Sequence, residues 1–444
     1  MERATDLAGL IRVTQSMPLR NGDFDKFYVN ASEARSIKDP AIRLVSFFEV
    51  NKNNPQKILF MGHGGCGKST ELKRINNNLG DGFFVTTFSV RDEIDIIDLK
   101  YVDLIFIILE KLMENLNILN IMINPNTLDT LYKYWHDERL IEKFGYEKME
   151  VEVNAEISIG TKLSFLAKMI ASVKGVLKTG KETKELVRSR IEPKISQLMS
   201  GINEVIDTIT IELKKRNMVP ILIIEDLDKL EITVAEDLFL NHKTILTNLN
   251  IHIIYTFPIF LFYSHNFKEI VKSFNRMEML NMIKVRNIDR SENKKGIDKI
   301  KEIISKRADI NKLFTNDALE FFVEKSGGAL RDVFEMIQSA ALTSMERKIE
   351  KIDLESAETA YSELRSGYSR SISKKHIELL SCIYNDPKKS PLVDDSNFNT
   401  NDNLKELLKS LAVIEYNDQR WCDLHPAVED FLVSNNHIKK TTTP

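Results

Sequence analysis

The sequence predicts an α/β fold with a parallel sheet as its core, followed by a helical region and a small C-terminal domain. Short apolar runs that are typical of buried parallel strands alternate with longer segments of helical spacing. Strands that alternate with helices in this way favour a parallel sheet that binds its ligand at the carboxyl ends of the strands. The length of 444 residues allows two or three domains.

Five short segments are predicted to be the strands of the sheet. Residues 83–90 alternate and are rich in β-branched and aromatic side chains. Residues 220–224 and 251–256 are continuous apolar runs, as in strands that are buried on both faces. In chain order the predicted strands are 57–61, 83–90, 220–224, 251–256 and 277–285. Helices are expected at 39–50, before the first strand, and at 98–119, packed against the sheet.

A long insertion, from about 137 to 217, separates the second predicted strand from the third. It contains a possible small strand pair at 150–159 and a helical segment at 184–215. Its basic residues between 161 and 194 are Lys162, Lys168, Lys174, Lys178, Lys181, Lys184, Arg188, Arg190 and Lys194. This is either a solvated helical insertion or a surface that contacts nucleic acid, an acidic partner or a neighbouring subunit.

The C-terminal third is predicted to contain a helical lid and a winged-helix domain. Residues 294–365 are helical, and the small and polar residues of 366–373 are typical of a linker. Helices at 374–385 and 401–411, followed by a hairpin around Asn417-Asp418, suggest a winged helix. The predicted parts are an N-terminal arm (1–38), a core (39–290), a helical lid (291–366) and a winged-helix domain (371–440).

The most specific motif is Gly62-His-Gly-Gly-Cys-Gly-Lys-Ser69, a full match to the P-loop pattern between a strand and a helix. Its glycines allow successive backbone N–H groups to point at phosphate oxygens. Lys68 is expected to reach the β and γ phosphates, and Ser69 to bind Mg²⁺. The predicted nucleotide-binding residues are Gly62, His63, Gly64, Gly65, Cys66, Gly67, Lys68, Ser69 and Thr70.

Two carboxylates, Glu225 and Asp226, follow directly after the predicted strand 220–224. A carboxylate at a strand tip can hold Mg²⁺, and a second one can orient the attacking water. By position Glu225 takes the first role and Asp226 the second. The usual order is Asp then Glu, so the pair is inverted. The shorter side chain of Asp226 is expected to reach the attacking water poorly, which argues against fast hydrolysis and leaves nucleotide binding intact.

Three further residues are candidates for sensing the nucleotide. Thr256 closes a predicted strand, with its hydroxyl beside the expected γ-phosphate. Arg331 follows Gly327-Gly328 and is expected to begin a lid helix, from which a guanidinium can reach the phosphates. Arg276, just ahead of the fifth strand, is a candidate arginine finger for a neighbouring subunit. The alternative for Arg276 is a weak surface ion pair.

The order of these motifs resembles the AAA+ and STAND classes of P-loop ATPases. The motifs concerned are 62–72, 221–229, 254–258 and Ser326-Gly-Gly-Ala-Leu-Arg-Asp-Val333. The last is similar to the sensor-2 motif of initiator-type ATPases. Glu225-Asp-Leu-Asp-Lys229 and the insertion before it are similar to KAP and STAND ATPases of bacterial conflict systems. The resemblance implies ATP and Mg²⁺ as ligands, a switch that forms homo-oligomers, and antiviral defence through a protein effector encoded nearby.

The first hypothesis is therefore an ATP-binding, ATP-hydrolysing regulatory switch. A second is a DNA-binding, initiator-like or transposition-helper ATPase, and a third is a non-hydrolysing nucleotide-dependent scaffold. The net charge of the chain is −3, which gives no global attraction to DNA. Residues 371–444 contain nine basic and eleven acidic residues, a net charge of −2. This balance is poor for phosphate contacts. We therefore expect a protein-interaction or autoinhibitory role for the winged helix.

The cysteines and the apolar segments predict a soluble protein of the reducing cytoplasm, without membrane contact. Cys66, Cys382 and Cys422 are far apart, so that neither a disulfide framework nor a zinc site is indicated. The N-terminus has no apolar core of a signal peptide. The longest near-apolar stretch, 251–263, is too short to span a bilayer and contains Pro258.

Overall fold

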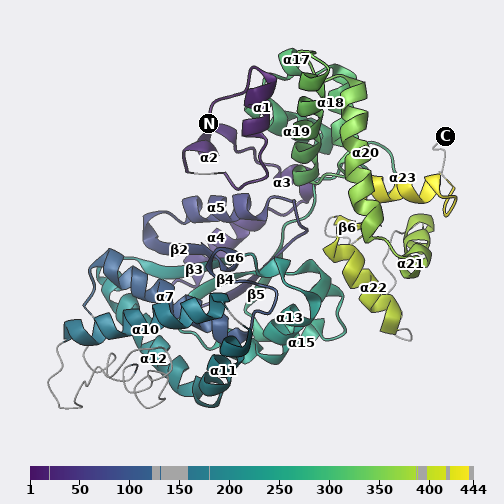
Figure 1. Cartoon of the computed structure of the whole chain (residues 1–444). Helices are drawn as coiled ribbons and strands as arrows, with labels where there is room; N and C mark the ends of the chain where they lie inside the picture. The colour runs from purple at the N-terminus through teal and green to yellow at the C-terminus, as the bar shows by residue number, and fades with distance from the viewer. Residues whose placement is uncertain are drawn as a thin grey trace.

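The computed structural model describes residues 1–19, 21–122, 131, 159–179, 181–386, 388, 398–416 and 421–439. Figure 1 shows a sheet covered by helices, a helical lid above it, and a C-terminal domain beside the lid. The predicted fold class is confirmed: an α/β P-loop core with a parallel sheet, followed by an α-helical lid and a winged-helix domain. Among the described residues, no helix combines the length and apolarity needed to cross a bilayer.

The core is a five-stranded parallel sheet in the order β2-β3-β4-β1-β5. The strands are β1 (Lys57–Met61), β2 (Phe83–Ser89), β3 (Val219–Glu225), β4 (His252–Phe257) and β5 (Arg276–Met279). The fifth strand is shorter than predicted, because its pairing with β1 ends at Met279. The next residues leave the sheet, and Met282 and Ile283 are buried in two clusters that include arm or lid residues.

Helices cover both faces of the sheet, because alternate residues of a strand point to opposite sides. On one face lie α4 (Pro40–Val50) and α5 (Lys68–Leu79), and on the other α7 (Tyr101–Leu119) and α12 (Ile195–Lys215). In β1, Ile58 belongs to the hydrophobic cluster that contains residues of α4 and α5, and Leu59 to the cluster that contains residues of α7 and α12. Shorter helices of the core include α6 (Val90–Glu93), α13 (Ile232–Glu236), α14 (Lys243–Thr247) and α15 (Phe267–Ser273).

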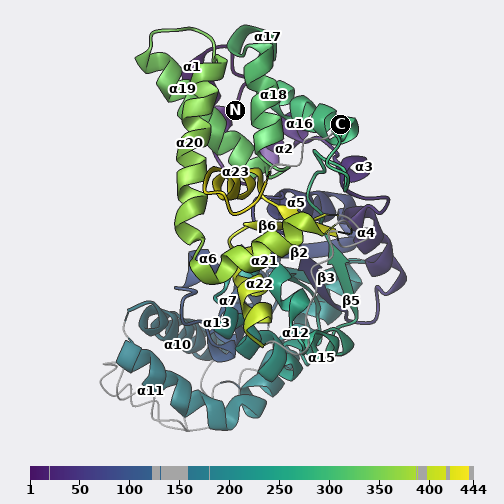
Figure 2. The ribbon, with the colours of Figure 1, turned by 90° about the vertical axis from the view of Figure 1, so that its right-hand side faces the viewer.

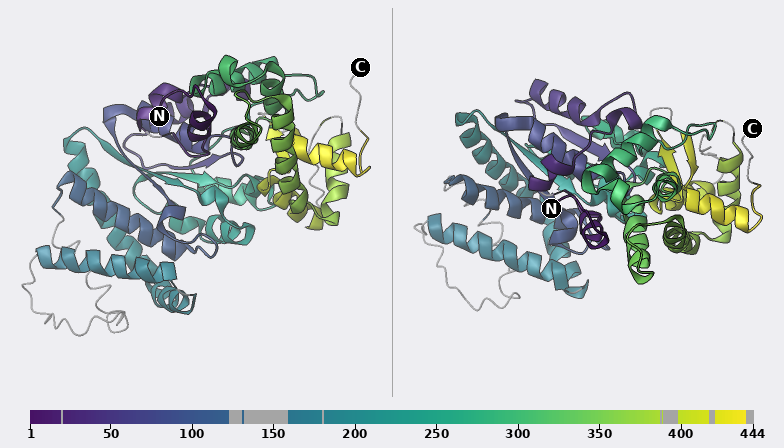
Figure 3. Two further views of the ribbon diagram at one scale, coloured as in Figure 1. Left: turned by 45° about the horizontal axis from the view of Figure 1, so that its top comes forward. Right: turned by 90° about the horizontal axis from the view of Figure 1, so that it is seen from above.

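The insertion forms α10 (Ile159–Thr179), α11 (Lys181–Ile191) and α12, at the opposite end of the molecule from the C-terminal domain (Figure 3). The predicted helix 184–215 is interrupted by a 3-10 turn at Glu192–Lys194, which contains Pro193. Proline cannot donate an interior helical hydrogen bond, which explains the break. The predicted strand pair at 150–159 lies outside the described residues, except for Ile159, which begins α10.

The N-terminal arm is packed into the lid. The arm contains α1 (Leu7–Val13), α2 (Asn21–Phe27) and α3 (Ser32–Arg35), and the lid contains α16 (Lys294–Arg307), α17 (Ile310–Leu313), α18 (Asn316–Lys325), α19 (Leu330–Glu346) and α20 (Leu354–Ser371). Leu7, Leu10 and Val13 share a hydrophobic cluster with Val333 and Ile337 of α19. The first helix of the arm therefore packs on α19 of the lid.

The predicted linker at 366–373 is wrong for most of its length, because α20 continues to Ser371. Tyr368 explains why this segment is helical. Its hydroxyl donates to Asp332 at 2.7 Å, and its ring stacks on His425 with centroids 4.2 Å apart. These contacts hold the end of α20 between the lid and the C-terminal domain.

The C-terminal domain has the helix, helix, hairpin order that the sequence predicts. Its elements are α21 (Lys374–Asn385), α22 (Phe398–Lys409), β6 (Val413–Tyr416), β7 (Trp421–Leu424) and α23 (Pro426–Ser434). The hairpin is antiparallel, and its predicted turn at 417–418 lies outside the described residues. Helix α23 was not predicted. His425 caps it by accepting a hydrogen bond from the Ala427 N–H.

Candidate functional site

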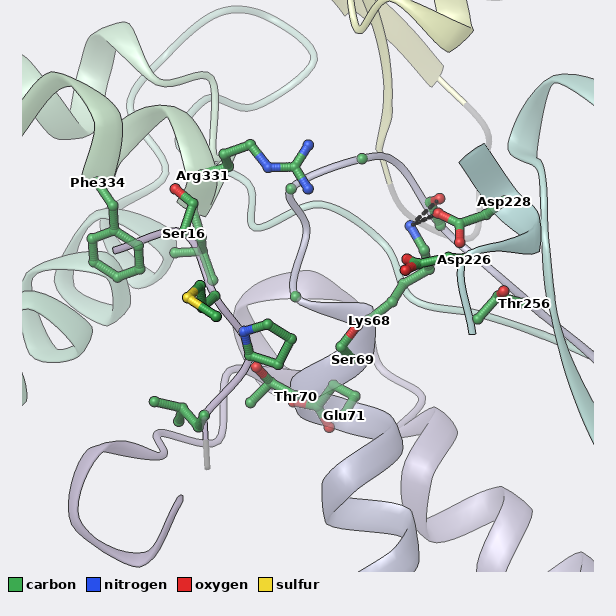
Figure 4. Close-up of a pocket in the computed structure, with 18 of the residues that line it drawn as sticks. Ser16, Lys68, Ser69, Thr70, Glu71, Asp226, Asp228, Thr256, Arg331 and Phe334 are labelled. Atoms are coloured by element: carbon green, nitrogen blue, oxygen red, sulfur yellow. Dashed lines mark hydrogen bonds and ion pairs between the residues drawn. The ribbon is translucent and has the colours of Figure 1, made fainter. Parts of the chain in front are cut away.

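The phosphate loop joins β1 to α5 and lines a cavity of about 550 Å³ between the core, the arm and the lid (Figure 4). Gly65 and Gly67 have φ angles of 76° and 99°, which glycine adopts at little cost. The lining includes Gly62, Gly64, Gly65, Gly67, Lys68, Ser69, Thr70, Asp226, Asp228, Thr256 and Arg331. The other predicted loop residues, His63 and Cys66, are fully buried and do not line this cavity.

Lys68 is held by groups of the protein itself. Its ammonium donates to the carbonyl oxygens of Gly62 at 2.8 Å and His63 at 2.7 Å, and pairs with Asp228 at 2.9 Å. Burial lowers the pKa of Lys68, but the Asp228 carboxylate outweighs it, so that the pKa lies above its usual value. Lys68 is therefore charged, and an anionic ligand at the loop would have to compete with these groups for it.

Asp228 is a residue of the site that the sequence analysis did not assign. It belongs to the 3-10 turn η3 (Leu227–Lys229), which turns the chain back toward the phosphate loop after β3. Its side chain is as buried as that of Lys68, each being 8% exposed. The available signal was the third acid of Glu225-Asp-Leu-Asp228, since a tight turn returns it to the strand end.

The two predicted Mg²⁺ ligands lie together. The side chains of Ser69 and Glu225 are hydrogen-bonded to each other. Burial and the neighbouring Asp226 and Asp228 raise the pKa of Glu225 above its usual value, although the bond with Ser69 lowers it. A bound divalent cation would relieve this repulsion. Mg²⁺ in nucleotide sites is bound by one or two protein oxygens together with phosphates and water, so these residues fit it.

The carboxylate of Asp226 is bound by two neighbours. The Ser89 hydroxyl donates to its carboxylate at 2.6 Å, and Lys229 pairs with it at 2.6 Å. Burial raises the pKa of Asp226, but the bonds from Lys229 and Ser89 bring it below its usual value. The carboxylate is ionised, yet it must exchange these partners before it can orient a water molecule.

The other predicted sensors differ in their placement. Thr256 lines the cavity, and its hydroxyl accepts from the Leu227 N–H at 3.0 Å and donates to the Ile224 carbonyl at 3.1 Å. Arg331 begins the lid helix α19, and Figure 4 shows its guanidinium beside the phosphate loop. The approach is close, because a Cβ added to Gly65 would lie 3.0 Å from the Arg331 Cβ.

Arg276 is not brought to the cavity. It lies at the start of β5, opposite Ile58, whereas the phosphate loop begins after Met61. Its guanidinium is bound to Glu278 at 2.6 Å and lies over the Phe47 ring, 4.9 Å from the centroid. Within its own chain Arg276 therefore packs at the edge of the sheet. Its role as an arginine finger in a neighbouring subunit stays a prediction.

The winged-helix domain contacts the phosphate loop directly. The Glu415 N–H of β6 donates to Nε2 of His63 at 2.8 Å. Burial, with a contribution from the nearby Lys68 charge, lowers the pKa of His63 to about 3, so its imidazole is neutral. Leu408 and Lys409 of α22 also line the phosphate-loop cavity. No sequence signal connects residues this far apart.

Helix α22 is fixed to the core by apolar and ionic contacts, and Figure 2 shows it beside α13. Leu404, Leu407 and Leu408 are buried in the core cluster that includes α7 and α12. Two lysines of α22 pair with acids of the α13 region: Lys405 with Glu236 at 2.7 Å and Lys409 with Glu231 at 2.5 Å. In a DNA-binding winged helix, the helix at this position contacts the bases; here that helix, α22, is packed against the core.

Comparison with known proteins gives structural likeness only. No protein-family model matches the sequence, and no curated protein matches it. The Aeropyrum pernix ORC1 protein in complex with DNA is 13% identical, with a TM-score of 0.34 and 90% of this chain and 92% of that chain covered. The Aeropyrum pernix ORC2 protein (ADPNP-ADP complexes) is 11% identical, with a TM-score of 0.41 and coverages of 89% and 92%.

The Thermotoga maritima RuvB Holliday junction branch migration motor is 10% identical, with a TM-score of 0.34 and coverages of 90% of this chain and 95% of that chain. Because the identities and TM-scores are low, no activity, ligand or partner of this protein follows from these likenesses.

Proposed function

We propose that the protein is a switch ATPase that binds ATP with Mg²⁺ in the phosphate-loop cavity and thereby controls the position of its winged-helix domain. The double role of His63 carries this proposal. Its carbonyl accepts from Lys68, and its imidazole accepts from Glu415 of the hairpin. When a phosphate takes Lys68, the loop residue that anchors the hairpin loses its internal partner. Nucleotide binding is thereby coupled to the domain.

Different residues of the cavity would bind the phosphates and the Mg²⁺ ion. Lys68 would bind the β and γ phosphates, while Ser69 and Glu225 would hold Mg²⁺, which neutralises charge on the phosphates. Arg331 would connect the lid to the nucleotide. Asp226 would orient the attacking water only after it leaves Lys229 and Ser89, which supports slow hydrolysis.

Five cations of the candidate nucleic-acid surfaces are paired within the chain, which favours this switch over a DNA-binding initiator. Lys405 and Lys409 of α22 are paired with acids of the core. In the insertion, Lys174 pairs with Glu93 and Glu110, Lys184 with Asp98, and Arg188 with Asp98, Asp103 and Glu185. Affinity for DNA comes from cations that neutralise phosphates, and these cations are already neutralised within the chain.

The partners that we propose are ATP, further copies of this chain and a protein effector encoded nearby, in a cytoplasmic antiviral defence system of bacteria. These partners and this setting rest on the resemblance of the motifs to STAND and KAP ATPases. Measurement of the native mass with and without MgATP tests the assembly. A larger species with MgATP is expected, and an unchanged monomer in both states would contradict it.

The switch itself is tested by titration of the wild type and the Lys68→Ala variant with MgATP. The wild type is expected to bind, and the variant to lose at least about tenfold in affinity, because a charge-assisted phosphate contact contributes about 1.5–3 kcal/mol. Phosphate release by the wild type and by Asp226→Ala separates a slow ATPase from a non-hydrolysing scaffold. Equal release by the two proteins would remove Asp226 from the mechanism.

A further inference from the structure

Arg91 lies at the nucleotide cavity, although the sequence analysis assigns it no role. It belongs to α6, two residues after Ser89, whose hydroxyl binds Asp226. Its side chain lines the cavity together with Asp226, Asp228 and Thr256. It also lines an adjoining cavity of about 660 Å³ formed with the loop at 92–97 and Lys178. Arg91 therefore lies just beyond the end of β2, the strand whose last residue, Ser89, pairs with Glu225 of β3.

The cations around this cavity differ in their partners. Lys68 is paired with Asp228, Lys229 with Asp226, and Lys409 with Glu231. Arg91 has no carboxylate within ion-pair distance among the described residues, and its side chain is exposed to solvent. A ligand that brings negative charge to this side of the cavity meets Arg91 without first having to break an ion pair.

We infer that Arg91 supplies a guanidinium to the γ-phosphate from within the chain, a role that the sequence analysis considered only for Arg276 in a neighbouring subunit. This inference rests on the proposed function. The water that Asp226 would orient attacks the γ-phosphorus, so a group beside Asp226 is also beside the γ-phosphate. Arg276, in contrast, is paired with Glu278 and lies over the Phe47 ring. It lies three residues before the end of β5, which at 3.3 Å per residue places it about 10 Å from the end of the strand, where the phosphate loop begins on β1.

The chemistry of the arginine side chain supports the same assignment. A planar guanidinium can donate two parallel hydrogen bonds to a phosphate, which a lysine such as Lys229 cannot. ADP has no γ-phosphate, so Arg91 contributes to the affinity for ATP and not to that for ADP.

The test compares ATP and ADP affinities, each with Mg²⁺, for the wild type and the variants Arg91→Ala, Arg276→Ala and Arg370→Ala. Arg370 is an exposed arginine outside the cavity and serves as the matched control. Arg91→Ala is expected to weaken ATP binding by about 10- to 100-fold and to leave ADP binding within about twofold. The other two variants are expected to keep the wild-type ratio of the two affinities.

Each outcome is decisive. If Arg91→Ala keeps the wild-type ratio of ATP to ADP affinity, or weakens both nucleotides equally, Arg91 does not contact the γ-phosphate. If only Arg276→Ala loses the preference for ATP, the role belongs to Arg276. If the wild type binds neither nucleotide, the proposed function fails and this inference fails with it. As a control for folding, the melting temperature of Arg91→Ala without nucleotide should equal that of the wild type. Arg91→Gln, whose side chain is closer in size to that of arginine, gives a second variant with the same expected loss of ATP affinity.

Discussion

The Glu415 backbone N–H donates a 2.8 Å hydrogen bond to Nε2 of His63 and joins the winged-helix hairpin to the phosphate loop. The carbonyl of the same histidine accepts from Lys68 at 2.7 Å. One buried residue therefore contacts both Lys68, the group proposed to bind phosphate, and the domain proposed to signal the bound state. In this structure the loop, the lysine and the hairpin form one connected set of hydrogen bonds.

The buried imidazole of His63 predicts a pH dependence of stability. Burial lowers its pKa to about 3, from an ordinary value of 6.5. The unfolded chain therefore binds a proton between these values that the folded chain does not, and the folded state loses stability as the pH falls through this window. His252, whose pKa burial lowers to about 4, acts in the same direction.

The measurement is the free energy of unfolding in urea between pH 7 and pH 4 for the wild type and His63→Ala. The wild type should lose more stability on acidification than the variant, which has no imidazole to protonate. The exposed His437 provides the control variant His437→Ala, which should follow the wild type. Parallel curves for the wild type and His63→Ala would show that His63 is not buried neutral.

Asp228→Asn tests the internal partner of Lys68. The variant leaves a buried ammonium without its carboxylate, which should destabilise the nucleotide-free protein by about 3 kcal/mol. Phosphates would then supply the missing charge, so the rise in melting temperature on adding MgATP should be larger than in the wild type. The control is Asp81→Asn, an exposed acid outside the cavity. A smaller rise than in the wild type would mean that Asp228 serves the nucleotide rather than competes with it.

Lys229→Ala tests how Asp226 is held. Lys229 is the main partner that lowers the pKa of Asp226 against the effect of burial. Without it, the pKa of Asp226 should rise. A carboxylate that must be ionised to act then loses activity at a higher pH. The acid limb of the pH profile of kcat/KM for ATP hydrolysis, which reports ionisations of the nucleotide-free protein, should therefore move to higher pH, and an unmoved limb would exclude Asp226 as the titrating group.

A charge exchange tests the docking of α22. Lys405→Glu places two acids together at Glu236, and a like-charge contact should loosen the helix from the core. The double variant Lys405→Glu with Glu236→Lys restores an opposite-charge pair in reversed order. Limited proteolysis should release the C-terminal domain faster in the single variant and at nearly the wild-type rate in the double variant. Equal rates in all three proteins would mean that this pair does not hold the domain.

Local motifs predicted what lies within a few residues of a strand end. The loop from Gly62 to Thr70 and the acids Glu225 and Asp226 lie at the ends of strands β1 and β3, as the fixed spacings of the P-loop pattern predict, and their roles stay predictions. Contacts between distant segments left no such pattern. The pair Lys68 with Asp228 depends on how a 3-10 turn folds back, and the bond of His63 to Glu415 depends on where a whole domain docks.

Two errors in the predicted fold have the same origin. The predicted fifth strand was too long because the apolar residues Met282 and Ile283 suggest a strand, whereas tertiary packing takes them away from the sheet. The predicted linker is helical because Tyr368 is anchored by Asp332 and His425. Composition alone does not reveal such an anchor.

The central claim is that bound triphosphate changes the hold of the phosphate loop on the winged-helix domain, and amide hydrogen exchange measures this directly. Exchange of the peptides that cover β6 and α22 is followed in the wild type and in Lys68→Ala, without nucleotide and with saturating MgATP. The account predicts faster exchange in these peptides when the wild type binds MgATP, and no change in Lys68→Ala. Unchanged or slower exchange in a wild type that is saturated with MgATP would contradict it.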